Sequence, residues 1–226
     1  MSPHPSSGET RRPCPGRRGG FTLVESLVVV LVLGLVIALC IPALSGVARS
    51  SALQQGGQLV EGMAVQARQT AVSKGTLVAL VILTEAGTEQ DYRALTLVEY
   101  SVERGWIQTG SWEVLPEGVI LDPLSQSSTL LAEGRAAFPL MPQDQPFPEL
   151  RFQGVKLGES QVAACIFMPS GGRRTPENPA QLRLVQGIRE GKGITYTNRL
   201  ADGLPADFID IAVVGVTGSI KTTRPS

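Results

Sequence analysis

The stretch RRGGFTLVESLVVVLVLGLVIALCIPAL, residues Arg17–Leu44, decides how the N-terminal part of this chain is organised. The 18 residues from Leu27 to Leu44 carry no charged side chain. A helix of that length spans ~27 Å, which is close to the hydrocarbon core of a bilayer. Residues 1–20 hold four arginines and one glutamate. This basic excess predicts a cytoplasmic N-terminus, with the rest of the chain on the other side of the membrane.

Simpler explanations of the apolar stretch are a secretory signal, a lipoprotein signal and an uncleaved membrane anchor. The stretch is longer than the roughly 7–15 apolar residues of a secretory signal peptide. A lipoprotein cut before Cys40 would need a small residue at the position of Leu39. The uncleaved anchor stays open.

The segment GGFTLVES, Gly19–Ser26, resembles the processing site of type IV prepilins and type II secretion pseudopilins. The resemblance implies that a prepilin peptidase cuts between Gly20 and Phe21 and then methylates the new amino group of Phe21. Glu25 becomes the fifth residue of the mature chain, where the family uses a glutamate in assembly. The implied partners are that peptidase, other pilin or pseudopilin subunits, an inner-membrane assembly platform and the lipid bilayer.

Physical chemistry supports a role for Glu25 independently of the resemblance. A charge within a membrane helix costs a few kcal/mol at the centre, and such charges are normally paired. Glu25 is near the expected helix N-terminus, where negative charge is favourable. The resemblance further implies that, in a stacked fibre, Glu25 of one subunit neutralises the Phe21 ammonium of a neighbour; the alternative is an acid that only reaches the lipid headgroups. Gly34 and Pro42 are expected to weaken the helix. The resemblance implies that the segment between them loosens within a fibre; the alternative is a fixed kink.

A second helical pattern follows from Ser50 to Lys74, with Gly75 as a plausible C-terminal cap. Three glycines, Gly56, Gly57 and Gly62, weaken its first half. The expected buried face consists of Leu53, Val60, Met63, Ala64, Ala67 and Ala71, and the expected exposed face of Gln54, Gln58, Glu61, Arg68 and Gln69.

After Gly75 the sequence predicts an antiparallel β-domain, so the fold class is α+β: a long N-terminal transmembrane helix packed on a C-terminal β-sheet domain. The segment Arg104–Leu121 is expected to form a hairpin in which Trp106 and Trp112 flank Thr109-Gly110. Residues 123–148 and 169–179 are expected to be loops. The remaining expected strands are 76–84, 92–100 with Tyr92, Ala94, Thr96, Val98 and Tyr100 on one face, 149–153, 162–168, 181–186, 194–197, 208–216 and a last one near the C-terminus.

These patterns divide the chain into a cleaved leader (1–20), an assembly helix (21–44), its amphipathic continuation (45–75) and a β-rich extracytoplasmic domain (76–226). The segment VQARQTAVSKGTLVALVIL resembles the helix-to-strand junction of minor pseudopilins related to the type II secretion H subunit and of FimT-like pilins. A narrower resemblance, to the pilin-like proteins of the Verru_Chthon cassette, comes from Arg93–Leu121.

The sequence offers no enzyme chemistry, cofactor or metal site. The one histidine, His4, lies in the leader, so a Ser–His or Cys–His catalytic pair is excluded from the outer domain. Cys165 lies in an apolar strand and is expected to be a buried structural thiol. SGGRR, residues 170–174, is expected to be a turn with exposed arginines, and Trp106 and Trp112 to be packing residues. A non-enzymatic structural subunit is therefore the expected function.

Nucleic acid is a further conceivable partner. From Arg173 to the C-terminus the sequence holds eight basic and five acidic residues. Contacts with phosphate need positive charges of this kind. A DNA-uptake or adhesive pilin and an uncleaved membrane-anchored binding domain are the rival functions; a mixed-charge solvated surface is the simpler explanation of the charges. The basic residues are Arg173, Arg174, Arg183, Arg189, Lys192, Arg199, Lys221 and Arg224.

Overall fold

The structure is a computed structural model that describes residues 22–133, 148–174, 180–191 and 193–224, with only the backbone for 39–49. The chain divides into two units, Met1–Ser45 and Gly46–Ser226. The division into 1–20, 21–44, 45–75 and 76–226 stays a prediction.

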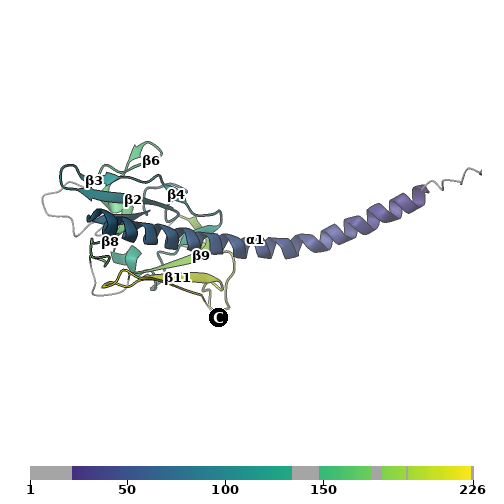
Figure 1. Cartoon of the computed structure of the whole chain (residues 1–226). Coiled ribbons are helices and arrows are strands. Elements are labelled where there is room, and N and C mark those ends of the chain that lie inside the picture. The colour runs from purple at the N-terminus through teal and green to yellow at the C-terminus, as the bar shows by residue number, and fades with distance from the viewer. Residues whose placement is uncertain (1–21, 134–147, 175–179, 192, 225–226) are drawn as a thin grey trace, which may run out of the picture. The chain divides into compact units, whose positions relative to one another are not determined.

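The predicted α+β fold class is confirmed: a long N-terminal helix is followed by antiparallel strands (Figure 1). The elements are α1 (Leu23–Lys74), β1 (Val78–Leu83), β2 (Ala94–Ser101), β3 (Gly105–Gln108), β4 (Glu113–Val114), β5 (Val119–Leu121), α2 (Thr129–Glu133), β6 (Arg151–Phe152), β7 (Val155–Lys156), the 3₁₀-helix η2 (Glu159–Gln161), β8 (Val162–Phe167), β9 (Ala180–Glu190), β10 (Gly193–Tyr196), β11 (Phe208–Val213) and β12 (Ile220–Thr223).

Two five-stranded sheets and one small ribbon make up the described β-structure. In the first sheet the order is β3-β2-β1-β8, and β4 also pairs with β2. In the second sheet the order is β10-β9-β11-β12, and β5 also pairs with β9. Strands β6 and β7 pair with each other. All strand pairs are antiparallel, which suits strands joined by turns and short loops.

The C-terminal part of α1 packs its apolar stripe into the core beside both sheets. Gly75 takes a positive φ of 64°, and the amide of Thr76 donates to the carbonyl of Ala71 at 3.2 Å. This six-residue closure is a Schellman cap, so the predicted stop at Gly75 is confirmed. All six positions of the predicted buried face are buried: Leu53, Val60, Met63, Ala64, Ala67 and Ala71.

Gly56 and Gly57 bring α1 close to the second sheet. A Cβ on Gly56 would lie 3.0 Å from Cγ1 of Val119, and one on Gly57 would lie 2.9 Å from Cδ1 of Ile209. Nothing lies within 4 Å of the corresponding point on Gly62. The first two glycines therefore permit a close helix–sheet contact as well as lowering helix propensity.

Strand β1 is buried on both faces and separates two apolar clusters. Val78, Leu80 and Ile82 belong to the cluster that includes α1. The alternating residues of β1 belong to a second cluster on the other face of the first sheet, which also contains Phe152 of β6. This double burial explains the nearly uninterrupted run of apolar residues in β1.

The expected hairpin around Thr109-Gly110 is wrong. Strands β3 and β4 do not pair with each other; both pair with β2, at Val98–Ser101 and at Ala94–Leu95 respectively. The hairpin turn lies earlier, between β2 and β3. Thr96 explains the path of Gly110–Ser111, because its hydroxyl donates to both of their carbonyl oxygens, at 3.0 and 3.1 Å.

Three smaller expectations also need correction. Tyr92 packs with the α1 cluster, whereas Ala94, Val98 and Tyr100 pack in the second cluster, so Tyr92 does not share the face of these three. The strand expected at 149–153 is reduced to β6. The expected loop 123–148 contains α2 in its described part, while 134–147 and 175–179 lie outside the described residues.

Candidate functional site

The first turn of α1 is closed by a threonine cap. The backbone amide of Glu25 donates to Oγ1 of Thr22 at 3.2 Å, and the amide of Ser26 donates to the carbonyl of Thr22 at 3.1 Å. Thr22 is thus the N-cap, and Glu25 is the third residue of the helix. Our sequence analysis missed Thr22, although Thr-x-x-Glu before an apolar run is a capping signal.

Glu25 is exposed and is the acidic residue of the first helical turn. The apolar residues of this segment are exposed as well, from 48% at Val29 to 81% at Leu23. A helix that exposes apolar side chains in every direction needs an apolar environment, either lipid or other helices. The acid and the apolar surface therefore lie within one continuous helical segment.

Of the other predicted positions of this site, the structure describes Gly34 and Pro42, whereas Gly20 and Phe21 lie outside the described residues. α1 is continuous through Gly34 and Pro42, and nothing lies within 4 Å of a Cβ built on Gly34. Loosening between these two residues stays a prediction about the assembled state. Within the described residues, no helix meets the length and hydropathy of a membrane span.

In the β-domain, a buried ion pair joins the turn before β2 to the end of β9. The Asp91 carboxylate is 2% exposed and accepts from Arg189 Nη1 at 2.9 Å. It also accepts from the backbone amides of Ala86, Gly87 and Thr88. A buried carboxylate is stable only when it is paired and hydrogen-bonded, and Asp91 is both.

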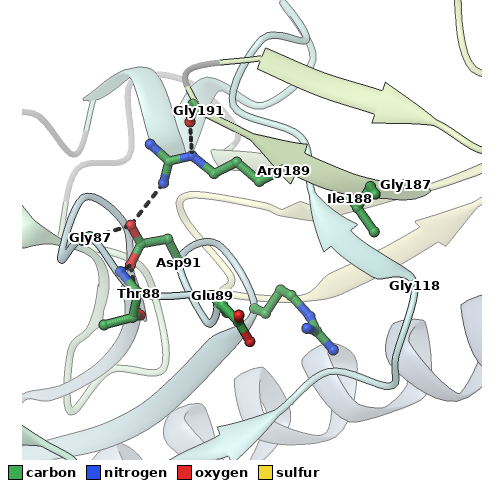
Figure 2. A pocket seen from close by; sticks show the side chains of 10 residues that line it. Gly87, Thr88, Glu89, Asp91, Gly118, Gly187, Ile188, Arg189 and Gly191 are labelled. Atoms are coloured by element: carbon green, nitrogen blue, oxygen red, sulfur yellow. Dashed lines mark hydrogen bonds and ion pairs between the residues drawn. The ribbon is translucent and has the colours of Figure 1, made fainter.

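Beside this pair is a cavity of about 540 Å³, shown in Figure 2. Figure 2 shows Arg189 extended from β9, with dashed contacts to Asp91 and to Gly191. A second cavity of about 430 Å³ shares Gly87, Asp91 and Arg189 with the first. The first cavity is lined by Gly87, Thr88, Glu89, Asp91, Arg93, Gly118, Gly187, Ile188, Arg189 and Gly191.

A second buried carboxylate, Asp122, binds Tyr196. The Tyr196 hydroxyl donates to Asp122 Oδ2 at 3.0 Å, and the amide of Leu124 donates to Oδ1 at 2.9 Å. Burial, followed by the nearby Asp122 charge and this hydrogen bond, raises the pKa of Tyr196 to about 12. The tyrosine therefore stays neutral well above physiological pH.

Several of the basic residues that had suggested nucleic-acid binding form contacts within the protein. Arg183 forms two hydrogen bonds to Asp210, both 2.7 Å long, and stacks on the ring of Phe208. Arg189 binds Asp91. Arg173 is 2% exposed, so the expectation that both arginines of SGGRR are exposed is wrong. Arg199, Lys221 and Arg224 are exposed, and Lys192 lies outside the described residues.

The two tryptophans and Cys165 are packing residues, as predicted. Trp106 is 5% exposed and meets Tyr100 edge to face, and Cys165 is 2% exposed. Trp112 meets Phe152 edge to face and donates from Nε1 to the carbonyl of Arg151 at 2.7 Å. Within the described ranges, no three His, Cys, Asp or Glu residues are grouped to hold a metal ion.

The N-terminal sequence matches a known motif. Residues 16–41 match the family described as the prokaryotic N-terminal methylation motif. The chain carries a prepilin-like N-terminus. The predicted resemblance to type IV prepilins and pseudopilins is thereby confirmed for this segment.

The prepilin-like chain has structural neighbours of low similarity. No curated protein sequence matches it. Two structures of the minor pseudopilin EpsH from the type II secretion system of Vibrio cholerae are similar at low TM-score. One has a TM-score of 0.42 at 13% identity, covering 77% of this chain and 98% of that chain. The other has a TM-score of 0.41 at 12% identity, covering 79% and 97%.

Proposed function

We propose that this protein is a non-enzymatic minor pilin or pseudopilin subunit of a type II secretion pseudopilus or type IV pilus-like fibre. A prepilin peptidase cuts between Gly20 and Phe21 and methylates the amino group of Phe21. The mature chain then joins a fibre through α1. The observation that carries the proposal is the methylation motif at 16–41, which ends in an exposed apolar helix with Glu25 in its first turn.

The electrostatics of the first turn suit an intersubunit role for Glu25. Cleavage creates an ammonium group on Phe21, one residue before the Thr22 cap. An uncompensated carboxylate or ammonium within lipid costs free energy, and their pairing removes much of that cost. Glu25 of one subunit therefore neutralises Phe21 of the next, and this pairing defines the axial register of the stacked helices.

The proposed location is the bacterial inner membrane before assembly. The arginines of residues 1–20 stay in the cytoplasm, residues 21–44 cross the bilayer, and the β-domain is extracytoplasmic. On extraction, neighbouring helices replace lipid around the apolar surface, and the segment between Gly34 and Pro42 loosens. The partners are the peptidase, the assembly platform and other subunits.

Mass spectrometry of the N-terminus of the native protein tests the processing step. A chain that begins with N-methylated Phe21 supports the proposal, whereas an intact leader supports the uncleaved anchor. Assembly is tested by fibre incorporation of Glu25→Gln against Glu103→Gln, an exposed acid in the β2–β3 turn. The first variant should insert into membranes but not enter fibres; normal incorporation would refute the role of Glu25.

The DNA-uptake alternative has a separate test. The exposed residues Arg199, Lys221 and Arg224 remain available to phosphate, whereas Arg183 and Arg189 are bound to carboxylates. A mobility shift of DNA at low salt that weakens as salt rises would support this alternative. Absence of a shift at low salt would exclude it.

A further inference from the structure

Strand β9 is longer than the strand that covers one of its edges. β5 pairs with β9 only from Leu184 to Gln186, and the amide of Gly187 still donates to the carbonyl of Gly118 at 2.9 Å. Before Val119 the chain turns away from β9, because the amide of Val119 donates to the carbonyl of Pro116 within a turn. The end of β9 therefore continues beyond its β5 partner.

The free edge can be assigned to one residue. The amide of Thr197 donates to the carbonyl of Gln186, so β10 occupies the edge to which even-numbered residues of β9 point. Successive residues of a strand direct their backbone groups to opposite edges. The amide and carbonyl of Arg189 thus point to the β5 side, where no described strand pairs with them.

This edge opens on the cavity of about 540 Å³, whose size is within the range of ligand pockets. Four of its lining residues are glycines, namely Gly87, Gly118, Gly187 and Gly191. Glycines expose backbone and permit the close approach of another chain. Ile188, at 56% exposure, supplies an apolar side chain to the same wall.

The wall opposite β9 is held in place before any ligand arrives. Asp91 accepts three backbone amides and the Thr88 hydroxyl, and Arg189 ties this turn to β9. Such preorganisation lowers the entropic cost of binding. The cavity is therefore bounded by two fixed walls, β9 and the turn that contains Asp91. It continues the line that β5 occupies farther along β9.

The charged groups indicate an acceptor in the ligand. Arg189 is paired with Asp91, whereas Nε of Arg93 is buried without a hydrogen-bond partner among the described residues. Nη2 of Arg93 is already used, by the carbonyls of Leu115 and Pro116. A carboxylate on the ligand would complement the positive charge of the Arg93 side chain, which lines the cavity.

We propose that the Arg189 edge of β9 and the adjoining cavity bind an extended polypeptide segment of another protein, added antiparallel to β9 in line with β5, with an acidic side chain directed to Arg93. Backbone pairing to an exposed edge supplies affinity, and the pocket supplies specificity. The inference depends neither on cleavage at Gly20 nor on fibre assembly.

The test uses the full chain in detergent micelles and the peptide acetyl-Val-Thr-Asp-Thr-Val-amide. Hydrogen–deuterium exchange of the fragment containing Arg189 should show one amide slowed about tenfold at a peptide concentration of about ten times Kd. The same peptide with an N-methylated Asp should not slow it, because it loses a backbone donor. A peptide with Lys in place of Asp should bind more weakly.

Two variants locate the effect. Glu89→Trp places a bulky ring on the cavity wall and should abolish the slowing, whereas Glu103→Trp, in the exposed β2–β3 turn, should not. No slowing at about 5 mM peptide, well above a Kd of about 1 mM, would overturn the proposal. Equal slowing by the N-methylated peptide, or in Glu89→Trp, would also overturn it.

Discussion

Nε of Arg68 on α1 lies 3.1 Å from the carbonyl oxygen of Gly171, in the loop after β8. The same Nε lies 3.1 Å from the carbonyl of Thr217, between β11 and β12. One side chain of the helix thus joins loops from both five-stranded sheets. The two loops touch through glycine: a Cβ on Gly218 would overlap the carbonyl of Gly171.

The first prediction concerns this contact. Arg68→Met keeps much of the aliphatic side chain but removes the donor to both carbonyls. Hydrogen bonds to charged groups contribute about 1.5–3 kcal/mol, so we expect a loss of about 1–3 kcal/mol in the free energy of unfolding. Urea unfolding of the full chain in micelles measures it. The control, Gln69→Met on the exposed face, should change stability by less than about 0.5 kcal/mol. Equal stability of the two variants would contradict this role of Arg68.

The second prediction concerns the helix–sheet contact. Gly57→Ala and Gly62→Ala gain the same helix propensity, but only the first places a methyl group 2.9 Å from Ile209. We expect Gly57→Ala to be about 1–3 kcal/mol less stable than Gly62→Ala, because overpacking a core costs that much. Thermal and urea unfolding measure the difference. If Gly57→Ala is the more stable variant, the close contact is not required.

The third prediction is a loss of stability at high pH through Tyr196. Its pKa is raised from 10.0 to about 12 in the folded chain. Protons are therefore held more tightly by the folded state, and the stabilisation is complete below about pH 10 and lost as pH rises toward 12. The free energy of unfolding of the wild type should fall over this range more than that of Tyr196→Phe. An absorbance titration should show a tyrosine transition near pH 12 that the variant lacks.

The fourth prediction concerns the start of α1. Thr22→Ala removes the side-chain acceptor for the Glu25 amide, while Thr22→Ser keeps a hydroxyl at that place. Loss of an N-cap weakens a helix end by about 0.5–2 kcal/mol. Exchange of the Glu25 amide in micelles should accelerate in Thr22→Ala and stay near the wild-type rate in Thr22→Ser. Unchanged exchange in both would show that the cap does not hold the first turn.

Local patterns predicted the helix and several strands well. The period of apolar residues identified the buried face of 50–74, and short apolar runs located β1 and β8. The path of Arg104–Leu121 was missed, because β3 and β4 take their hydrogen bonds from β2 rather than from each other. Pairing partners of this kind are not encoded in the spacing of residues along one segment.

The candidate sites divide in the same way. The methylation motif and Glu25 were readable from the sequence because the motif is a continuous local pattern. Local sequence also contained the cap at Thr22, in its Thr-x-x-Glu spacing. The Arg189–Asp91 pair joins residues far apart in the chain, and no local signal linked them.

The sequence by itself determined the prepilin-like N-terminus, the amphipathic face of α1 and the α+β class, since each depends on residues a few positions apart. Only the tertiary structure decided that Arg183 and Arg189 are bound to carboxylates and that Gly57 lies against Ile209. The tertiary structure also decided that one edge of β9, beside a cavity, has no described partner strand. These features depend on contacts between distant segments, and the burial and pairing energies that select them exist only once the chain has folded.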